Sequence, residues 1–353
     1  MILLVSFALL VLVGFFIKKN VIFSWLEIIL LTITVGVATN VADFNAYNRV
    51  YQFIGNGNYY PNTGNGWWLL CKFGNMLGLS YAQFKMLILF VGLLLIRSTI
   101  KYFTNDPNYI WSLYLIYPVI TDLIQIRFFV GIVIAIWALR YLVSDTPKGY
   151  VIYFISILVA GQCHNSAYFY LIFVFWKFVI KNVQKVIIGL VIFLGLCLAE
   201  KNILINIISS FGTGQENEFY LNNTLYQPTK TQMLFFTLVN IAFILISKYI
   251  RDSISASDQI EISKVERNYV DFMLATNIMA IVILVMAVFS YTFFRLQKPL
   301  WLLNYIDVAI FSMHIKKGTI SPGIIIAIYA FLGAVALIGT ESQALNDFFF
   351  VLR

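Results

Sequence analysis

The segment YPVITDLIQIR at residues 117–127 guides the interpretation of this sequence, because polar and charged side chains interrupt a long apolar run there. A second break, GQCHNS at residues 161–166, lies in the same apolar region, which extends over residues 109–180. A charged residue inside a membrane segment is costly, so it usually faces the protein interior or a water-filled cavity and indicates a function. The two breaks contribute an aspartate, an arginine and one of the two histidines of the chain. They predict a functional site if both lie on the same side of a membrane.

The composition is that of an integral membrane protein. Of the 353 residues, 61% are hydrophobic and 11% are charged, whereas soluble domains carry roughly 25% charged residues. The formal net charge of +8 does not indicate nucleic acid as a partner, because membrane proteins concentrate Lys and Arg in cytoplasmic loops. Cys71, Cys163 and Cys197 have neither metal-site nor disulfide spacing and are interpreted as apolar packing residues. No nucleotide-binding, metalloprotease or serine-hydrolase motif stands in a supporting context.

The apolar runs predict an all-α polytopic membrane protein with about twelve transmembrane helices, forming a single transmembrane domain over residues 1–353. A span needs about 20 apolar residues. One helix over residues 149–180 would be about 48 Å long against a hydrocarbon core of about 30 Å, so we expect it to break near His164. The expected spans are residues 2–17, 21–41, 84–100, 109–121, 127–142, 149–163, 166–180, 184–200, 232–250, 269–290, 299–313 and 320–339.

The positions of Lys and Arg predict which ends of the spans face outward. If each of the two sequence breaks separates two helices, 15 of the 24 basic residues fall on one side of the membrane. This excess is expected for the cytoplasmic side. Both termini then lie outside, and the first apolar run is a retained span because it lacks a positive n-region. Two outer-face loop insertions, near residues 42–83 and 201–231, are rich in Asn, Gly, Tyr and Gln. Trp67 and Trp68 in the first are interpreted as interfacial anchors, with contact to sugar rings as the alternative.

Two arginines at the outer end are candidates for binding phosphate. A guanidinium is permanently charged, and its planar donors suit phosphate. Arg127 begins a span with Asp122 and Gln125 nearby, and Arg295 follows another span. Both would lie at the level of a lipid diphosphate. The alternative is that each only anchors a helix end to lipid headgroups.

His164 and Asp43 are candidate general bases. The unperturbed pKa of histidine, about 6.5, lies near working pH, and His164 is followed by Asn165 at the end of an apolar run. The alternative is a histidine that only forms a hydrogen bond across helices. If the segment after Asp43 is helical, Asp43 and Tyr47 share one face, which Tyr51 continues. Such a carboxylate either holds sugar hydroxyls, serves as the base, or caps a short surface helix.

Taken in order, these residues resemble the EpsG-like family of bacterial exopolysaccharide proteins, which are related in role to Wzy-type polymerases. The resemblance extends over roughly residues 25–315 and includes Gln125-Ile126-Arg127 opening a span, His164-Asn165-Ser166, Asp43, Tyr47 and Tyr51 after the second span, and Arg295 after the tenth. It implies a glycosyltransferase in the bacterial cytoplasmic membrane that joins oligosaccharide repeat units carried on undecaprenyl diphosphate at the outer leaflet. It also implies a helical fold related to the lipid-linked sugar transferases called GT-C.

Glycosyl transfer from a lipid diphosphate needs a base for the attacking hydroxyl and cations for the leaving diphosphate. We expect His164 to be the base, with Asp43 as its partner or substitute, and Arg127 and Arg295 to bind the diphosphate. The expected substrate contacts are Tyr47, Arg49, Tyr51, Asp122, Gln125 and Asn165. No acidic cluster indicates a tightly held metal, so we predict a metal-independent site without a cofactor.

Other functions stay open at this point. A flippase or exporter of lipid-linked sugars often has two related halves with discontinuous helices at mid-membrane, and the sequence has no matching halves. A ligase that joins finished polymer to another acceptor would consume the same donor at the same face. A membrane acyltransferase using His164 would need a cytoplasmic thioester donor, whereas the topology places His164 outside. The sugar, the linkage, the stereochemical outcome and the binding of a chain-length regulator or other assembly proteins also stay open.

Overall fold

The computed structural model describes all residues except 1, 18, 40, 42, 61–62, 106, 201–226, 257–261, 315–319 and 341–353. The described residues form helices and no strand, which confirms the all-α prediction. The chain divides into a first unit, Met1–Leu171 with Trp301–Arg353, and a second unit, Ile172–Leu300. The single transmembrane domain expected from the sequence stays a prediction. Most of the second loop insertion, with Glu216 and Glu218, lies outside the described residues.

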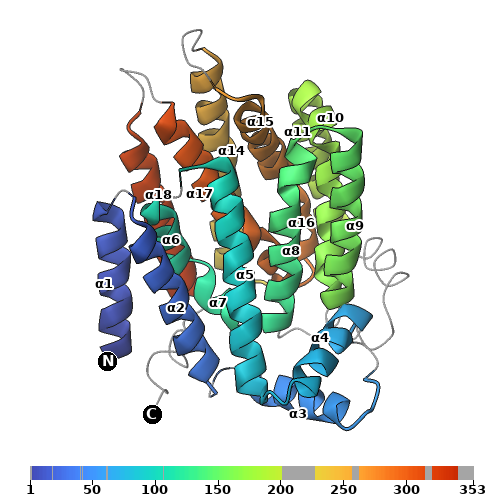
Figure 1. Cartoon of the computed structure of the whole chain (residues 1–353). Coiled ribbons are helices and arrows are strands. Elements are labelled where there is room, and N and C mark those ends of the chain that lie inside the picture. Colours follow the sequence, from blue (N-terminus) through green and yellow to red (C-terminus); the bar gives the residue numbers. More distant parts are fainter. Residues whose placement is uncertain are drawn as a thin grey trace. The chain divides into compact units, whose positions relative to one another are not determined.

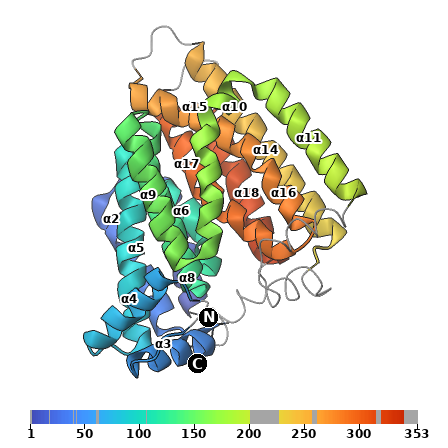
Figure 2. The same cartoon turned by 90° about the vertical axis from the view of Figure 1, so that its right-hand side faces the viewer.

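The first unit contains most of the predicted site residues (Figure 1). Its helices are α1 (Ile2–Phe16), α2 (Val21–Val37), α3 (Phe44–Gly55), α4 (Asn65–Met76), α5 (Tyr81–Phe103), α6 (Asn108–Ile116), α7 (Val119–Ile124), α8 (Ile126–Val143), α9 (Pro147–Cys163) and α18 (Pro322–Thr340). The 3-10 segment η1 (Asn165–Phe175) and helix α17 (Lys298–Met313) pass from one unit into the other. Helix α5 packs between α2 and α8, and α8 packs on α9. The short helices α3 and α4 lie at one end of α5, α8 and α9 in both views (Figures 1 and 2).

The second unit is built around α15. Its elements are α10 (Trp176–Lys181), α11 (Val183–Ala199), α14 (Lys230–Ser255), α15 (Lys264–Met279), α16 (Ile281–Ala287) and the 3-10 segment η4 (Tyr291–Gln297). Buried amides join α14 to α15, because Asn240 Nδ2 donates to the Asn277 carbonyl (3.1 Å) and Asn277 Nδ2 donates to Ser247 Oγ (3.2 Å). Such hydrogen bonds hold apolar helices together where the hydrophobic effect between them is weak.

Capping residues explain where the long helices begin. Ser80 and Gln83 form a reciprocal capping box that starts α5 at Tyr81, three residues earlier than the apolar pattern predicts. Thr146 accepts a hydrogen bond from the Gly149 N–H and is followed by Pro147 at the first position of α9, a favoured helix start.

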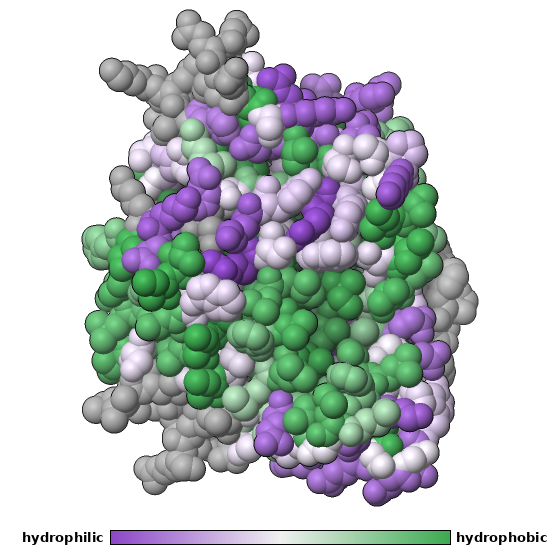
Figure 3. Space-filling view, viewed as in Figure 1, coloured by the Kyte–Doolittle hydropathy of each residue, from purple (hydrophilic) through white to green (hydrophobic). Residues whose placement is uncertain are grey.

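Five described helices are long and apolar enough to cross a membrane, by length and composition: Tyr81–Phe103, Ile126–Val143, Lys230–Ser255, Lys264–Ala287 and Pro322–Gly339. Shorter apolar helices cover Val5–Phe16, Val21–Thr34 and Val183–Ala199. On the face formed by α2 and α5, hydrophobic side chains cover the middle and hydrophilic ones gather toward both ends (Figure 3). These features are those of a membrane-embedded protein. The count of twelve spans stays a prediction, because the expected span 109–121 is divided into α6 and α7 and the expected helix 166–180 begins as a 3-10 segment.

The second sequence break is a helix end, as predicted, whereas the first contains the whole of α7 and divides the expected span 109–121. Helix α6 ends before Tyr117, whose carbonyl accepts a hydrogen bond from the Tyr305 hydroxyl (3.0 Å) and whose ring packs on Trp301 (centroids 4.8 Å apart). Helix α9 ends at Cys163, and His164 has an extended backbone (φ −153°, ψ 121°). The end of α9 and the start of α8 are therefore available to build a site.

Candidate functional site

Arg127 connects the start of α8 to the end of α9. Its Nε donates a hydrogen bond to the carbonyl of Cys163 (2.9 Å). Cys163 is the last residue of α9, and the carbonyls of a last helical turn have no partner within the helix. The half-buried guanidinium is thus held in place by backbone, next to His164.

His164 is oriented from both sides by its neighbours. Its ring meets the Phe128 ring edge to face, with centroids 5.3 Å apart. Its Nδ1 accepts a hydrogen bond from the Ser166 backbone N–H (3.2 Å). In a neutral imidazole one nitrogen donates and the other accepts, so this hydrogen bond assigns the proton to Nε2. Neutral His164 then presents Nε2–H as a donor. A donor can bind a phosphate oxygen, but it cannot accept the proton of a sugar hydroxyl.

Helix α4 packs directly on the end of α9. A Cβ at Gly64 would lie 2.2 Å from the Gln162 carbonyl oxygen, and the φ of Gly64 is +75°. A Cβ at Gly66 would lie 3.0 Å from Cys163 Sγ. Only glycine combines this backbone conformation with such a close approach. The first loop insertion is therefore a helix pair, α3 and α4, that covers the Arg127 and His164 end of α9.

Trp67 lies in the interior of this helix pair rather than at the membrane interface. It is 1% exposed, and its ring meets Tyr47 (centroids 6.1 Å) and Phe84 (5.8 Å). The interpretation of Trp67 as an interfacial anchor, or as a sugar contact, is therefore wrong. Trp68 is more exposed, and the Lys72 ammonium lies 5.0 Å from its ring centroid.

Tyr51 and Cys71 are buried beside the site. The Tyr51 hydroxyl donates to the Leu79 carbonyl (2.9 Å), and its ring stacks on Phe84 (5.0 Å). Burial raises the pKa of Tyr51 to about 12. Burial also raises the pKa of the Cys71 thiol to about 12, although nearby Arg127 acts to lower it. Both groups are thus neutral near pH 7, and Cys71 is a packing residue at the edge of the site.

Asp43 precedes α3 but does not cap it with its side chain. It occupies the N-cap position with a left-handed backbone (φ 66°), and its carboxylate makes no cap hydrogen bond. The capping alternative is therefore wrong. The segment after Asp43 is helical, which was the condition for Asp43 and Tyr47 to share one face. Asp43 and Tyr47 are both close enough to Tyr81 to interact with it electrostatically. Asp43 and Arg49 are exposed.

The remaining first-unit candidates differ in accessibility. Gln125 immediately precedes α8, is half-buried, and its Oε1 has no hydrogen-bond partner among the described residues. Asp122 is 2% exposed and accepts a hydrogen bond from the Tyr114 hydroxyl (3.3 Å). Asn165 is exposed at the start of η1.

Arg295 belongs to η4 of the second unit, where it is half-buried. Two residues later, Gln297 is 1% exposed, and neither side-chain polar atom has a hydrogen-bond partner within the described chain. Burying an unpaired amide is costly, so Gln297 is a candidate ligand contact that the sequence patterns did not single out. The available signal was its position between Arg295 and Lys298, in otherwise apolar sequence.

Within the first unit, α4 packs on both of the segments that carry four predicted residues, the end of α9 and the start of α3. Gly66 of α4 packs against Cys163, whose carbonyl binds Arg127 and which precedes His164. Trp67 of the same helix packs on Tyr47, and the Tyr47 N–H donates to the Asp43 carbonyl. We call Asp43, Tyr47, Arg127 and His164 the Arg127 cluster. It combines a carboxylate, an aromatic hydroxyl, a fixed cation and an imidazole. In the part of the chain that the structure describes, no three His, Cys, Asp or Glu side chains form a possible metal site.

The sequence matches the model of the EpsG family over residues 21–351, nearly the whole chain. No curated protein and no solved structure matches it.

Proposed function

The chain belongs to the EpsG family, and from this premise we propose that it is a polysaccharide polymerase that joins oligosaccharide repeat units carried on undecaprenyl diphosphate. Family membership and the apolar helices make it an exopolysaccharide-related membrane protein of the polymerase type. The proposal adds that the donor is a glycan on undecaprenyl diphosphate and that the protein lies in the bacterial cytoplasmic membrane. It further adds a site on the extracytoplasmic side, about twelve transmembrane spans and a GT-C-like fold. The observation that carries it is the guanidinium of Arg127, held by the Cys163 carbonyl beside His164.

The proposed reaction transfers the growing chain to an incoming unit. A hydroxyl at the non-reducing end of that unit loses its proton to a base while its oxygen bonds to the anomeric carbon of the growing chain. The bond from that carbon to the diphosphate oxygen breaks, and undecaprenyl diphosphate leaves with the electron pair. The step therefore needs a base on one side of the anomeric carbon and positive charge or hydrogen-bond donors on the other.

Asp43 is the better candidate for the base. A carboxylate accepts protons, and the Asp43 carboxylate is exposed and not used to cap α3. The sequence predicts His164 as the base, but its Nδ1 already accepts from the Ser166 N–H. We therefore assign its Nε2–H to the leaving diphosphate, as a donor beside Arg127. Donors that are already oriented stabilise developing charge without reorganisation during the reaction.

The other predicted residues take supporting parts in the proposal. Tyr47, Arg49, Gln125 and Asn165 are the sugar contacts, because their side chains are exposed or half-buried. Tyr51 and Asp122 are buried and hydrogen-bonded to Leu79 and Tyr114, so they position neighbours. Arg295 stays a predicted diphosphate contact, tested by its own variant.

The test uses purified protein in liposomes with an undecaprenyl-diphosphate repeat unit, and products are followed as a ladder on a gel. We expect wild type to produce a ladder, and Arg127→Ala and Asp43→Asn to abolish it. Arg127→Lys, which keeps the charge but loses the planar fork, should retain part of the yield.

Three outcomes would contradict the proposal in different ways. Substrate that crosses the liposome membrane without a ladder would make the protein a flippase or exporter. Single transfer of finished polymer to another acceptor would make it a ligase. A ladder of wild-type length from both Arg127→Ala and Asp43→Asn would show that the reaction does not take place at the Arg127 cluster.

A further inference from the structure

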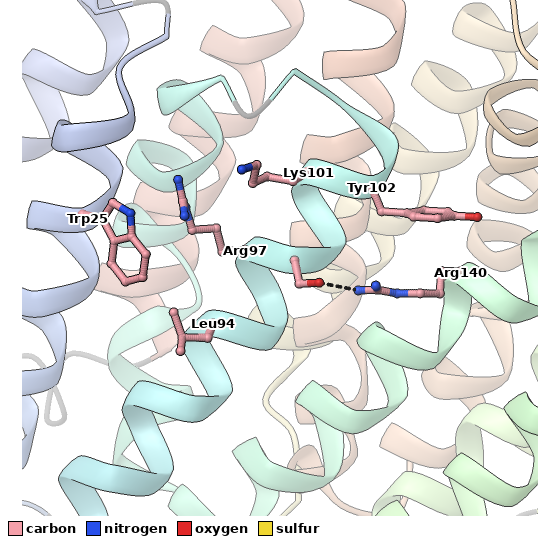
Figure 4. A pocket seen from close by; sticks show the side chains of 7 residues that line it. Trp25, Leu94, Arg97, Lys101, Tyr102 and Arg140 are labelled. Carbon is pink, nitrogen blue, oxygen red and sulfur yellow. Dashed lines mark hydrogen bonds between the residues drawn. The ribbon is translucent and has the colours of Figure 1, made fainter.

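A basic pocket lies in the first unit, at the end of α8 away from Arg127. Its volume is about 460 Å³, and it is lined by Trp25, Leu94, Arg97, Ser98, Lys101, Tyr102 and Arg140 (Figure 4). These residues come from α2, α5 and α8. Arg140 is separated from Arg127 by about 20 Å along α8, at about 1.5 Å per residue. The pocket is therefore distinct from the Arg127 cluster.

Arg140 is fixed in the pocket wall by hydroxyl and carbonyl groups. Its Nη2 donates to Ser98 Oγ (3.1 Å) and to Thr99 Oγ1 (3.2 Å), and its Nε donates to the Trp137 carbonyl (3.0 Å). Its guanidinium also lies 5.3 Å from the ring centroid of Tyr102. None of these partners is charged, so the positive charge is oriented without being neutralised by them.

Arg97 and Lys101 bring two further charges from α5. The Arg97 side chain is 8% exposed, and its guanidinium lies 4.8 Å from the Trp25 ring centroid, a cation–π arrangement. Lys101 follows one turn later and is exposed. In Figure 4, Arg97 and Lys101 extend from α5 with Trp25 beside Arg97, and Arg140 points from α8 toward α5. The lining, all of it within the described chain, includes three cations and no carboxylate.

One wall of the pocket leads into an apolar surface. Leu94 lines the pocket, and Val91 and Leu87 continue the same face of α5 with 47% and 37% of their surface exposed. On α2, Ile29 lies one turn after Trp25 and is 48% exposed. A ligand that places an anion among the cations would thus have exposed apolar side chains beside the rest of its body. This combination fits a lipid with a charged headgroup better than a free anion.

We propose that this pocket binds the phosphate group of an anionic membrane lipid. Three cations from α5 and α8 line a basic pocket of the kind that recognises lipid headgroups, and guanidinium donors match phosphate oxygens in pairs. The acyl chains lie along Leu94, Val91 and Ile29. Trp25 and Tyr102 flank the headgroup at the depth where aromatic side chains favour the interface.

The experiment measures phosphatidylglycerol retained by the purified full-length protein, by native mass spectrometry after titration against phosphatidylcholine. The test variants are Lys101→Gln, Arg140→Gln and the double variant. The matched control is Lys148→Gln, an exposed lysine at the start of α9 outside the pocket. We expect about tenfold weaker retention for each pocket cation removed and wild-type retention in the control.

Three other outcomes would overturn the proposal. Equal losses in Lys148→Gln would indicate general attraction of lipid to positive charge. Wild-type retention in the double variant would show that the pocket binds no headgroup. Saturable binding of inorganic phosphate in detergent, with no preference for phosphatidylglycerol over phosphatidylcholine, would make a soluble phosphate the ligand. If Arg140→Gln lowers the melting temperature, the exposed Lys101→Gln variant alone decides.

Discussion

The two ends of α8 each carry an arginine, and the surroundings of the two arginines differ. Arg127 and Arg140 lie near its start and its end. Two aspartates also have a left-handed backbone, Asp43 (φ 66°) before α3 and Asp145 (φ 59°) in the turn after α8. At the first end the arginine donates to a helix-terminal carbonyl beside a histidine, whereas at the other it is surrounded by hydroxyls and aromatic rings.

In the two proposals, this difference separates a site for chemistry from a site for binding. The Arg127 cluster contains both a proton acceptor and donors for a leaving group, which a transfer reaction requires. The basic pocket contains only cations, hydroxyls, rings and one leucine, so it can hold an anion but has no carboxylate or histidine in its wall to move a proton. Matched substitutions at the two ends test this distinction.

The largest expected effect comes from exchanging the two aspartates for asparagine. Asparagine tolerates the left-handed backbone, so both variants keep the fold while losing the carboxylate. Asp43→Asn should lower the polymerisation rate about 10³-fold, as expected on removing a general base. Asp145→Asn should stay near the wild-type rate. The initial rate of ladder formation is measured for both variants. Equal rates would show that Asp43 is not the general base.

Next in size is the comparison of the two arginines. Arg127→Ala should reduce the rate of polymer formation about 10²-fold or more, because charge on the leaving diphosphate loses an oriented donor. Arg140→Ala should reduce it less than about threefold and instead weaken retention of phosphatidylglycerol. The polymerisation rate and the retention of phosphatidylglycerol are measured on the same preparation of each variant. A larger loss of polymer in Arg140→Ala than in Arg127→Ala would reverse the roles of the two ends.

Much of the fold is predictable from sequence, because the length of an apolar run and the polar residues that interrupt it are local features of the chain. The end of α9 at Cys163 follows from the polar residues that interrupt the apolar stretch there. The end of α6 before Tyr117 does not, because it lies inside the expected span 109–121. The segment after Asp43 was expected in a loop insertion, and the spacing of its aromatic residues is only compatible with the helix α3 found there. The 3-10 segment after Asn165 was not predictable in this way, since its residues are as apolar as those of a regular helix.

The site was predictable by residue type but not by geometry. Arg127 and His164 stand out as polar residues in apolar sequence, yet nothing local indicates that Arg127 binds the Cys163 carbonyl. The tautomer of His164 depends on the Ser166 N–H, and therefore on how the chain turns after α9. The polar loop around Trp67 predicts an exposed ring, whereas packing between α3, α4 and α5 buries it. These features depend on contacts between distant segments.

A smaller effect is expected at the contact of α4 with α9, which lies near Arg127 and has no counterpart near Arg140. Gly64 (φ +75°) faces the Gln162 carbonyl, whereas Gly78 (φ +68°) faces open space, since a Cβ added there would have nothing within 4 Å. Gly64→Ala should lower the free energy of unfolding by about 3 kcal/mol and Gly78→Ala by about 1 kcal/mol. Thermal unfolding in detergent compares them. Equal shifts would mean that backbone conformation alone matters and that the helix contact does not.

The smallest effects separate two tyrosines on α3, Tyr47 and Tyr51. Tyr51→Phe loses the hydrogen bond to the Leu79 carbonyl and should destabilise the fold by about 1 kcal/mol, with kcat near the wild-type value. Tyr47→Phe should leave the melting temperature close to wild type and raise KM for the lipid-linked unit severalfold, because its half-buried hydroxyl faces the site in the proposal. If Tyr51→Phe instead changed KM alone, the buried tyrosine would have to reach substrate by a rearrangement of α3. The helix pair would then be a moving part of the site rather than its fixed cover.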